Sequence, residues 1–249
     1  MKLIILFIMG LFAGCINTIV GAGSFFSIPS LLLFGLDAKI AVATNRFSFI
    51  FLALTNSATL YKNKVLNLKR ALKFSIFASL GSLLGAHFVV KINESIMENI
   101  VIVLLLVIFF KYLIPANRLN LTPKINCIKY KFLFYLLLFI IGIYGGFFGV
   151  AITVFFVASM VFFLDLPLIE AMATNQIIIL FISIVASIIF IKNRLVDYYA
   201  AVPLITGMSA GGFITFKFII ESKSKKLEKI FIVALGLMIL ITFIKFKFF

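Results

Sequence analysis

Ala41-Val-Ala-Thr-Asn-Arg46 occurs again later in the chain as Ala171-Met-Ala-Thr-Asn-Gln176. A second stretch, Tyr61-Lys-Asn-Lys-Val-Leu-Asn67, returns as Ile191-Lys-Asn-Arg-Leu-Val-Asp197 at the same separation along the chain. Two motifs that recur in the same order indicate an internal duplication. The sequence therefore predicts two homologous halves.

Glycine interrupts the apolar segment that precedes each copy of these motifs. Gly21-Ala-Gly23 does so in the first half, and Gly145-Gly-Phe-Phe-Gly149 does so in the second. Repeats that each contain an interrupted apolar segment are typical of secondary transporters, in which the substrate site lies between the repeats.

The composition indicates an integral membrane protein. The chain has 249 residues, of which 64% are hydrophobic and 12% are charged, and its mean hydropathy is +1.26. Soluble domains carry about 25% charged residues, so the expected partner is the lipid bilayer. The net charge of +15 does not indicate nucleic-acid binding, because the lysines flank apolar spans, where they set topology and anchor anionic lipid.

Eight apolar segments are each close to the ~20 residues that span hydrocarbon. They run from about 3–20, 40–60, 72–90, 97–114, 132–149, 169–191, 198–219 and 229–246. Two shorter stretches, 24–36 and 150–164, are predicted to be half-helices that enter the bilayer and return. The fold class is all-α, with a first transmembrane repeat over 1–114, a polar linker over 115–131 and a second repeat over 132–249.

The distribution of basic residues leaves the topology open. With eight spans, the side that carries the chain termini has about twice as many Lys and Arg residues as the other, which predicts cytoplasmic termini. If the two short stretches also cross, each half has five spans, the repeats are inverted, and the same ratio places the termini outside. Segment length favours the eight-span arrangement.

The interrupted segments are candidates for an anion site. A helix that restarts near Ser24 would turn backbone N–H groups and the positive end of its dipole inward, and the stretch after Gly149 would do the same. Gly21, Gly23 and Gly145 belong to the same candidate site. Alternatively, these glycines only let helices pack closely, as Gly10-xxx-Gly14 and Gly81-xxx-Gly85 are expected to do.

Further polar residues lie inside the predicted spans. They are Asn17, Thr44, Asn45, Thr174, Asn175 and Gln176 in the candidate site, and Asn56, for which packing is the favoured role. Such groups are costly in hydrocarbon unless they are hydrogen-bonded, so they either bind ligand directly or bond to neighbouring helices and to the opened backbone.

Arg46 is the charged residue that lies well inside a predicted span. Buried arginine suggests function, because the guanidinium binds oxyanions through a fork of donors. The alternative is that Arg46 reaches the headgroups near Lys39. The second copy has Gln176 at this position.

The sequence offers little for catalysis. Acidic residues lie in loops or at segment ends, His87 is the sole histidine, and Cys15 and Cys127 have no metal-ligand spacing. A catalytic cluster and a nucleotide-binding loop are both lacking. We therefore expect a protein that is not an enzyme, with no cofactor and no metal.

These motifs together resemble the sulfite exporter TauE/SafE family, also called the TSUP permeases. The resemblance is carried by Gly14-x-x-Asn17-x-x-x-Gly21-x-Gly23, Ser27-Ile-Pro29, Ala41-x-x-Thr44-Asn45, Gly142-x-x-Gly145-Gly146-x-x-Gly149 and Ala171-x-Ala173-Thr174-Asn175. It implies a membrane permease for small anions, often sulfur-containing, such as sulfite or sulfonates. The first cluster reads Gly-Ala-Gly-Ser where the family often has more glycines.

The sequence thus predicts a multi-pass permease of the cell membrane whose substrate is a small anion. The competing class is a membrane scaffold protein without substrate, in which the polar residues inside the spans bond only to one another and leave no hydrated cavity. The sequence does not decide the oligomeric state, and a homo-oligomer is compatible with it.

Overall fold

The computed structural model describes residues 2–62, 66–113 and 131–219. The predicted linker over 115–131, except for Lys131, and the predicted span over 229–246 lie outside the described residues. The first half contains α1 (Lys2–Val20), α2 (Ser24–Phe34), α3 (Ala38–Lys62), α4 (Leu68–Lys91) and α5 (Glu94–Leu113). The second half contains α6 (Lys131–Phe147), α7 (Ile152–Leu164), α8 (Leu168–Lys192) and α9 (Tyr198–Ile219). The prediction of an all-α fold is confirmed.

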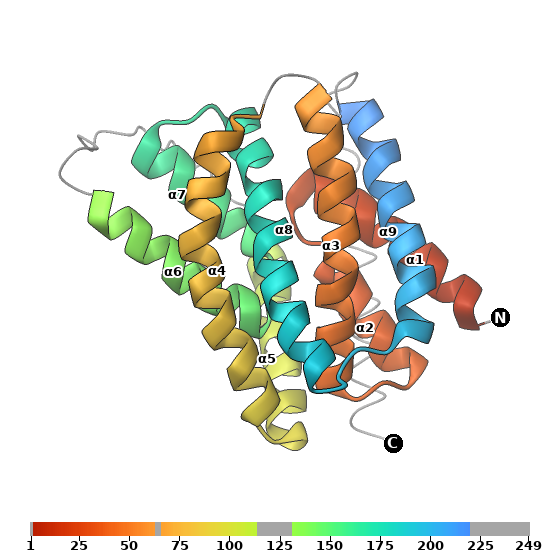
Figure 1. Ribbon diagram of the computed structural model, residues 1–249. Coiled ribbons are helices and arrows are strands. Elements are labelled where there is room, and N and C mark those ends of the chain that lie inside the picture. Colours follow the sequence, from red (N-terminus) through yellow and green to blue (C-terminus); the bar gives the residue numbers. More distant parts are fainter. Residues whose placement is uncertain (1, 63–65, 114–130, 220–249) are drawn as a thin grey trace.

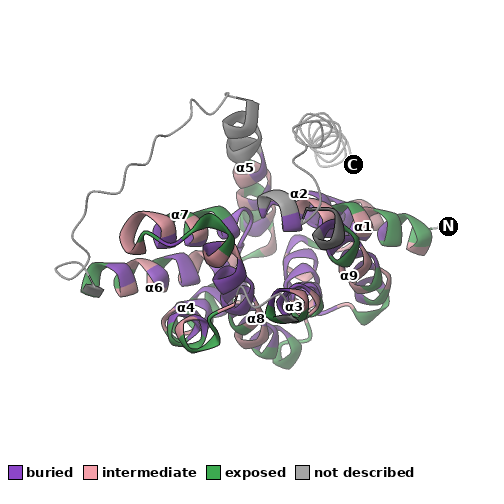
Figure 2. Ribbon diagram, turned by 90° about the horizontal axis from the view of Figure 1, so that it is seen from above, coloured by how far each residue is buried: buried purple, intermediate pink, exposed green. Residues whose placement is uncertain are grey.

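Four long helices form a row along one face of the molecule. Viewed from above, the row runs α4, α8, α3, α9, with α6 and α7 behind one end and α1 and α2 behind the other (Figure 2). The two halves interlock, because α1 packs on α9 and α6 packs on α4. The helices of the row turn buried faces toward one another and exposed faces outward (Figure 2).

The two copies of the Ala-Thr-Asn motif lie on α3 and α8, so α3 corresponds to α8 and α4 corresponds to α9. Corresponding helices of the two halves run in opposite directions. In Figure 1, α3 and α9 run upward, whereas α4 and α8 run downward. The end of α3 and the start of α4 therefore lie at one end of the bundle, and the end of α8 and the start of α9 lie at the opposite end. The halves are thus an inverted repeat, related by a pseudo-twofold axis across the helices.

The inverted arrangement differs from the one that segment length favoured. By length, α2 and α7 do not count as membrane crossings. α2 has 11 residues and α7 has 13, which is too few to span hydrocarbon. Each of these helices nevertheless adds a reversal of the chain, and an odd number of passages per half inverts the second copy. The inference that the chain termini are cytoplasmic rested on eight spans, so the inverted arrangement removes its support.

The short helices begin where the sequence places the breaks. α1 ends at Val20 and α2 restarts at Ser24, while α6 ends at Phe147 and α7 restarts at Ile152. The predicted half-helices over 24–36 and 150–164 are confirmed as separate helices. α2 ends at Gly35, whose φ of 114° lets its N–H bond back to the carbonyls of the last helical turn.

Helices of the two halves that pack on each other, α4 on α6 and α1 on α9, approach closely enough for their backbones to touch. A Cβ atom at Gly81 or Gly85 on α4 would overlap the α6 backbone, and one at Gly142 or Gly146 on α6 would overlap α4. The contact between α1 and α9 repeats this arrangement through Gly10, Gly14, Gly207 and Gly211. The packing predicted for Gly10-xxx-Gly14 and Gly81-xxx-Gly85 is confirmed, and small residues of this kind drive helix association in lipid.

The outer surface of the helices is apolar. Ile76, Phe88, Ile140 and Phe213 are examples of large side chains that are more than half exposed. In the described residues, α3 (over Ala38–Tyr61), α4 and α8 are long and apolar enough to cross a membrane alone. Such a surface is expected against acyl chains.

Replacing Gly142 with Leu should prevent the close approach of α4 and α6. The added side chain meets the backbone of Ala78, which cannot rotate away, so we expect a loss of at least about 2 kcal/mol of stability. Ala58→Leu, at an exposed position on α3, is the matched control. Thermal stability in detergent measures both; equal stability of the two variants would contradict this packing.

Inverted repeats predict that the two Lys-Asn loops are labelled from opposite sides of the membrane. Single cysteines would replace Lys69 and Arg194 in a chain whose native cysteines are changed to Ser. We expect a membrane-impermeant thiol reagent to modify one of them in intact cells and the other only after permeabilisation. Labelling of both from the same side would contradict the inverted arrangement.

Candidate functional site

The two helix breaks meet in the middle of the molecule. Gly21 and Gly149 both have positive φ, 75° and 67°, which glycine adopts without strain. A Cβ atom at Gly21 would overlap Thr153 at the start of α7, so the first break packs directly on the second. Ala151 also has a positive φ, of 56°, which is uncommon for a residue with a Cβ atom.

In the first half, the side chain of Asn45 joins α3 to the start of α2. Its Nδ2 donates to Ser24 Oγ at 3.3 Å, and its Oδ1 accepts from Ser27 Oγ. Asn17 supports the same break from α1, because its Oδ1 accepts the Gly23 N–H at 3.4 Å. All these side chains are buried, so the bonds hold the break in place without water.

In the second half, Asn175 plays the corresponding part for α8 and α7. Its Nδ2 donates to Thr153 Oγ1 at 3.2 Å, and its buried Oδ1 has no hydrogen-bond partner among the described residues. Tyr144 adds a bond that the first half lacks, donating its hydroxyl to the carbonyl of Val150 at 2.8 Å. The Ala-Thr-Asn motif therefore positions its Asn against a broken helix in both halves.

Arg46 connects the first half to the break of the second. Its side chain is 2% exposed, and its Nη2 donates to the carbonyl of Phe148 at 3.3 Å. The guanidinium lies so close to Gly149 that a Cβ atom there would overlap it, and it also stands 5.9 Å from the centre of the Phe49 ring. The alternative in which Arg46 reaches the headgroups is wrong, because a main-chain carbonyl freed by the break accepts its donor inside the protein.

Gln176 occupies the position equivalent to Arg46 but has a different partner. Its Oε1 accepts from Asn56 Nδ2 at 3.4 Å, and the same amide nitrogen lies 3.3 Å from Thr18 Oγ1. The packing role favoured for Asn56 fits this bridge between α1, α3 and α8, although its Oδ1 has no partner in the described part of the chain. The pseudo-symmetric scaffold thus carries one cation on one side only.

Three of the candidate residues do not reach the breaks in this way. Thr44 accepts from the N–H of Asp197 at 3.0 Å and so ties α3 to the loop before α9. Thr174 Oγ1 is buried without a partner in the described residues. Gly145 lies against the side chains of Ile152 and Ile182, where it allows close packing.

The backbone amides at the start of α2 are largely used within the fold. The N–H groups of Phe25, Phe26 and Ser27 bond to preceding carbonyls, and the Gly23 N–H bonds to Asn17. At the start of α7, the N–H groups of Ile152 and Val154 likewise bond to the carbonyls of Gly149 and Ala151. The prediction that the helix starts offer free N–H groups to an anion is therefore wrong for these amides, although the two starts do lie together.

The site is closed in this structure. Its candidate residues on α1, α3 and α8 are each 3% exposed or less. Two cavities, of about 600 and 500 Å³, reach Tyr144 and Phe147 at the end of α6, but the candidate residues do not line them. Closure of this kind is expected both of a scaffold protein and of a transporter in which access to the site alternates.

Tyr144, Thr153 and Ser27 belong to the polar network but are absent from the residues predicted from the sequence. Tyr144 immediately precedes Gly145, and the other two lie within one turn of a predicted helix start. Polarity next to a glycine break was the available signal for all three.

An inverted repeat with two broken helices, joined by buried polar side chains, defines the class of polytopic helical transporters. Residues 6–242 match the family described as "Sulfite exporter TauE/SafE". The chain belongs to this family, as the motifs predicted.

Curated relatives are similar over different lengths. A "Probable membrane transporter protein" of Haemophilus influenzae is 31% identical over 59% of this chain, and the match spans only 57% of that relative. YfcA of Escherichia coli K12, "Probable membrane transporter protein YfcA", is 24% identical over 94% of this chain and 87% of its own. YunE of Bacillus subtilis, with the corresponding name, is 23% identical over 85% and 86%. No solved structure matches.

Gly149 and Arg46 should be energetically coupled. Gly149→Ala adds a methyl group that meets the guanidinium and a residue that disfavours this φ, so we expect a loss of about 1–3 kcal/mol. In an Arg46→Met background only the φ cost and the contact of the new methyl group with the Gly145 carbonyl should remain. A double-mutant cycle in thermal unfolding should give a coupling energy of at least about 0.5 kcal/mol; strict additivity would place Arg46 away from the break.

Proposed function

We propose that this protein is a permease of the cell membrane for a small, sulfur-containing or organic anion such as sulfite or a sulfonate. The observation that carries the proposal is the guanidinium of Arg46, buried at the point where the breaks of both halves meet. An arginine in the interior of a membrane protein is expensive to maintain and is retained where it meets a ligand. Its planar fork of donors suits sulfite and sulfonate oxygens.

The anion binds by replacing the carbonyl of Phe148 as the acceptor for Arg46. A neutral carbonyl at 3.3 Å is a weak partner for a cation, and an oxyanion is a stronger one because both members are charged. The Nδ2 groups of Asn45 and Asn175 lie at the two neighbouring helix starts. Both can turn from hydroxyl oxygens to the anion, which would place it between the halves.

The inverted halves account for alternating access. In such repeats, rocking of one half against the other exposes a fixed central site to each side in turn. The closed site described above is the occluded member of this cycle. Arg46 is the link that the cycle must loosen, since it belongs to α3 of the first half and bonds to the break of the second.

The charge distribution supports one orientation in the membrane. Lys62, Lys69, Arg70 and Lys73 cluster at the end of the bundle where α3 ends and α4 begins, and this end faces the cytoplasm by the positive-inside rule.

The scaffold alternative is weakened by the family. The relatives are named as transporters, and the unpaired Oδ1 of Asn175 and Oγ1 of Thr174 are acceptors that a purely structural network would be expected to satisfy.

Flux into proteoliposomes tests the proposal. The assay would compare sulfite, sulfate, thiosulfate, sulfonates and small carboxylates, with and without a proton gradient. Arg46→Gln should lower the apparent affinity for the transported anion roughly tenfold to hundredfold, as expected for the loss of a charge-assisted hydrogen bond. Arg194→Gln, an exposed change of the same kind in the loop before α9, is the control. Equal flux in both variants would remove Arg46 from the site, and absence of flux for the whole panel would reject the anion class.

A further inference from the structure

Three cations that are separate from Arg46 lie around a cavity at the end of the bundle where α4 begins. The cavity has a volume of about 550 Å³. α4, α6 and the connection from α7 to α8 enclose it, with Lys69, Arg70, Lys73, Phe134, Tyr135 and Leu166 among its lining residues. None of the residues that line it belongs to the candidate anion site.

The cations of this cavity are only partly neutralised. Arg70 forms an ion pair with Glu170 at the start of α8, at 2.5 Å. Asp165, the acid in the connection from α7 to α8, is not among the residues that line the cavity. Lys69 and Lys73 are exposed, and Arg70 lies between them in the sequence. Two of the three cations therefore have no ion-pair partner among the described residues, so the cavity is complementary to a negative group.

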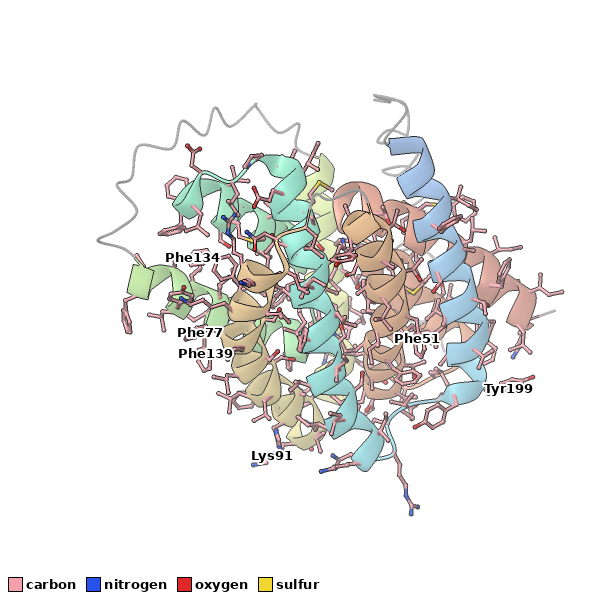
Figure 3. All side chains as sticks on the ribbon, turned by 45° about the horizontal axis from the view of Figure 1, so that its top comes forward. Phe51, Phe77, Lys91, Phe134, Phe139 and Tyr199 are labelled. Atoms are coloured by element: carbon pink, nitrogen blue, oxygen red, sulfur yellow. The ribbon has the colours of Figure 1, made fainter. Side chains whose placement is uncertain are left out.

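Aromatic rings fix the position of one of these lysines. The Nζ of Lys73 stands 5.4 Å from the centre of the Tyr135 ring, within the range of a cation–π contact. Tyr135 in turn packs on Phe77, with ring centres 4.5 Å apart, and Phe74 packs on Phe134 at 5.0 Å. Figure 3 shows Phe77 and Phe134 beside α4. The ammonium group is thereby held at the wall of the cavity.

The surface that adjoins the cavity is suited to acyl chains. On α4, Leu72 and Ile76 are exposed one residue before and three after Lys73, and on α6 the exposed residues Phe132, Leu133 and Leu136 flank Phe134 and Tyr135. A cationic cavity next to an apolar outer face matches a molecule with a phosphate head and hydrocarbon tails. Free phosphate has no apolar part that could contact this face.

We infer that this cavity binds the headgroup of an anionic phospholipid, with the phosphodiester between Lys69 and Lys73 and the acyl chains along α4 and α6. Basic pockets between transmembrane helices recognise anionic lipid in this way. The ion pair of Arg70 and Glu170 joins α4 of one half to α8 of the other beside the headgroup. The bound lipid therefore sits at a contact between the two halves.

Native mass spectrometry of the full chain in detergent tests the inference, with phosphatidylglycerol and phosphatidylcholine as probes. We expect phosphatidylglycerol to bind in preference. Lys69→Gln combined with Lys73→Gln should weaken that binding roughly tenfold. Lys91→Gln combined with Lys192→Gln removes two exposed cations at the opposite end of the bundle and should leave the binding unchanged. Lys69→Arg combined with Lys73→Arg should retain the binding, which separates charge from folding.

Two results would overturn the inference. One is equal loss in the two Gln pairs, which would mean that lipid binding responds to net charge, or no loss in either pair, which would mean that Lys69 and Lys73 do not bind the lipid. The other is competition by soluble glycerol phosphate at concentrations comparable to the lipid, which would identify a site for a free phosphate compound without acyl chains. Because the readout is lipid binding, neither result depends on whether the protein transports an anion.

Discussion

A helix that breaks inside a membrane leaves main-chain donors and acceptors without partners, and hydrocarbon supplies none. The structure of this protein is organised around that constraint. Both breaks lie at the centre, packed on each other at Gly21 and Thr153. Their freed groups are bonded by side chains from neighbouring helices: Asn17 to the Gly23 amide, Arg46 to the Phe148 carbonyl and Tyr144 to the Val150 carbonyl. Asn17, Arg46 and Tyr144 thus each bond to main-chain groups that the breaks leave open.

The two halves solve the same problem with unequal chemistry. Asn45 and Asn175 serve both breaks in nearly the same way, as expected of a duplicated motif. Arg46 and Gln176 have diverged, so that the two copies of the motif differ in charge at this position. In the proposed mechanism, the symmetric scaffold makes the rocking motion equivalent toward either side, and the charge of Arg46 selects a negative substrate.

Local features of this fold could be predicted from the sequence, because they depend on nearby residues. The glycines fixed both breaks, and the starts of α2 and α7 lie within two residues of the expected positions. The direction of the second half could not be predicted by length, since an 11-residue helix is too short to count as a span yet still reverses the chain. The partner of Arg46 was out of reach for a different reason. Phe148 is apolar, and its carbonyl became an acceptor only because α6 ends at Phe147; no side-chain pattern records that.

The closed centre is consistent with a protein that conducts an anion. A water-filled cavity at this depth would let ions leak across the membrane. In a permease, acceptors within the protein can instead bond to the donors of the site while no substrate is bound. The Phe148 carbonyl serves this purpose for Arg46, and the hydroxyl groups of Ser24 and Thr153 serve it for the two asparagines. Each partner is neutral, so each bond is weaker than the charged bond that would replace it. In the proposed mechanism, binding of the anion exchanges these hydrogen bonds for charged ones. The free energy gained by the exchange would be available to move the guanidinium of Arg46 away from Gly149.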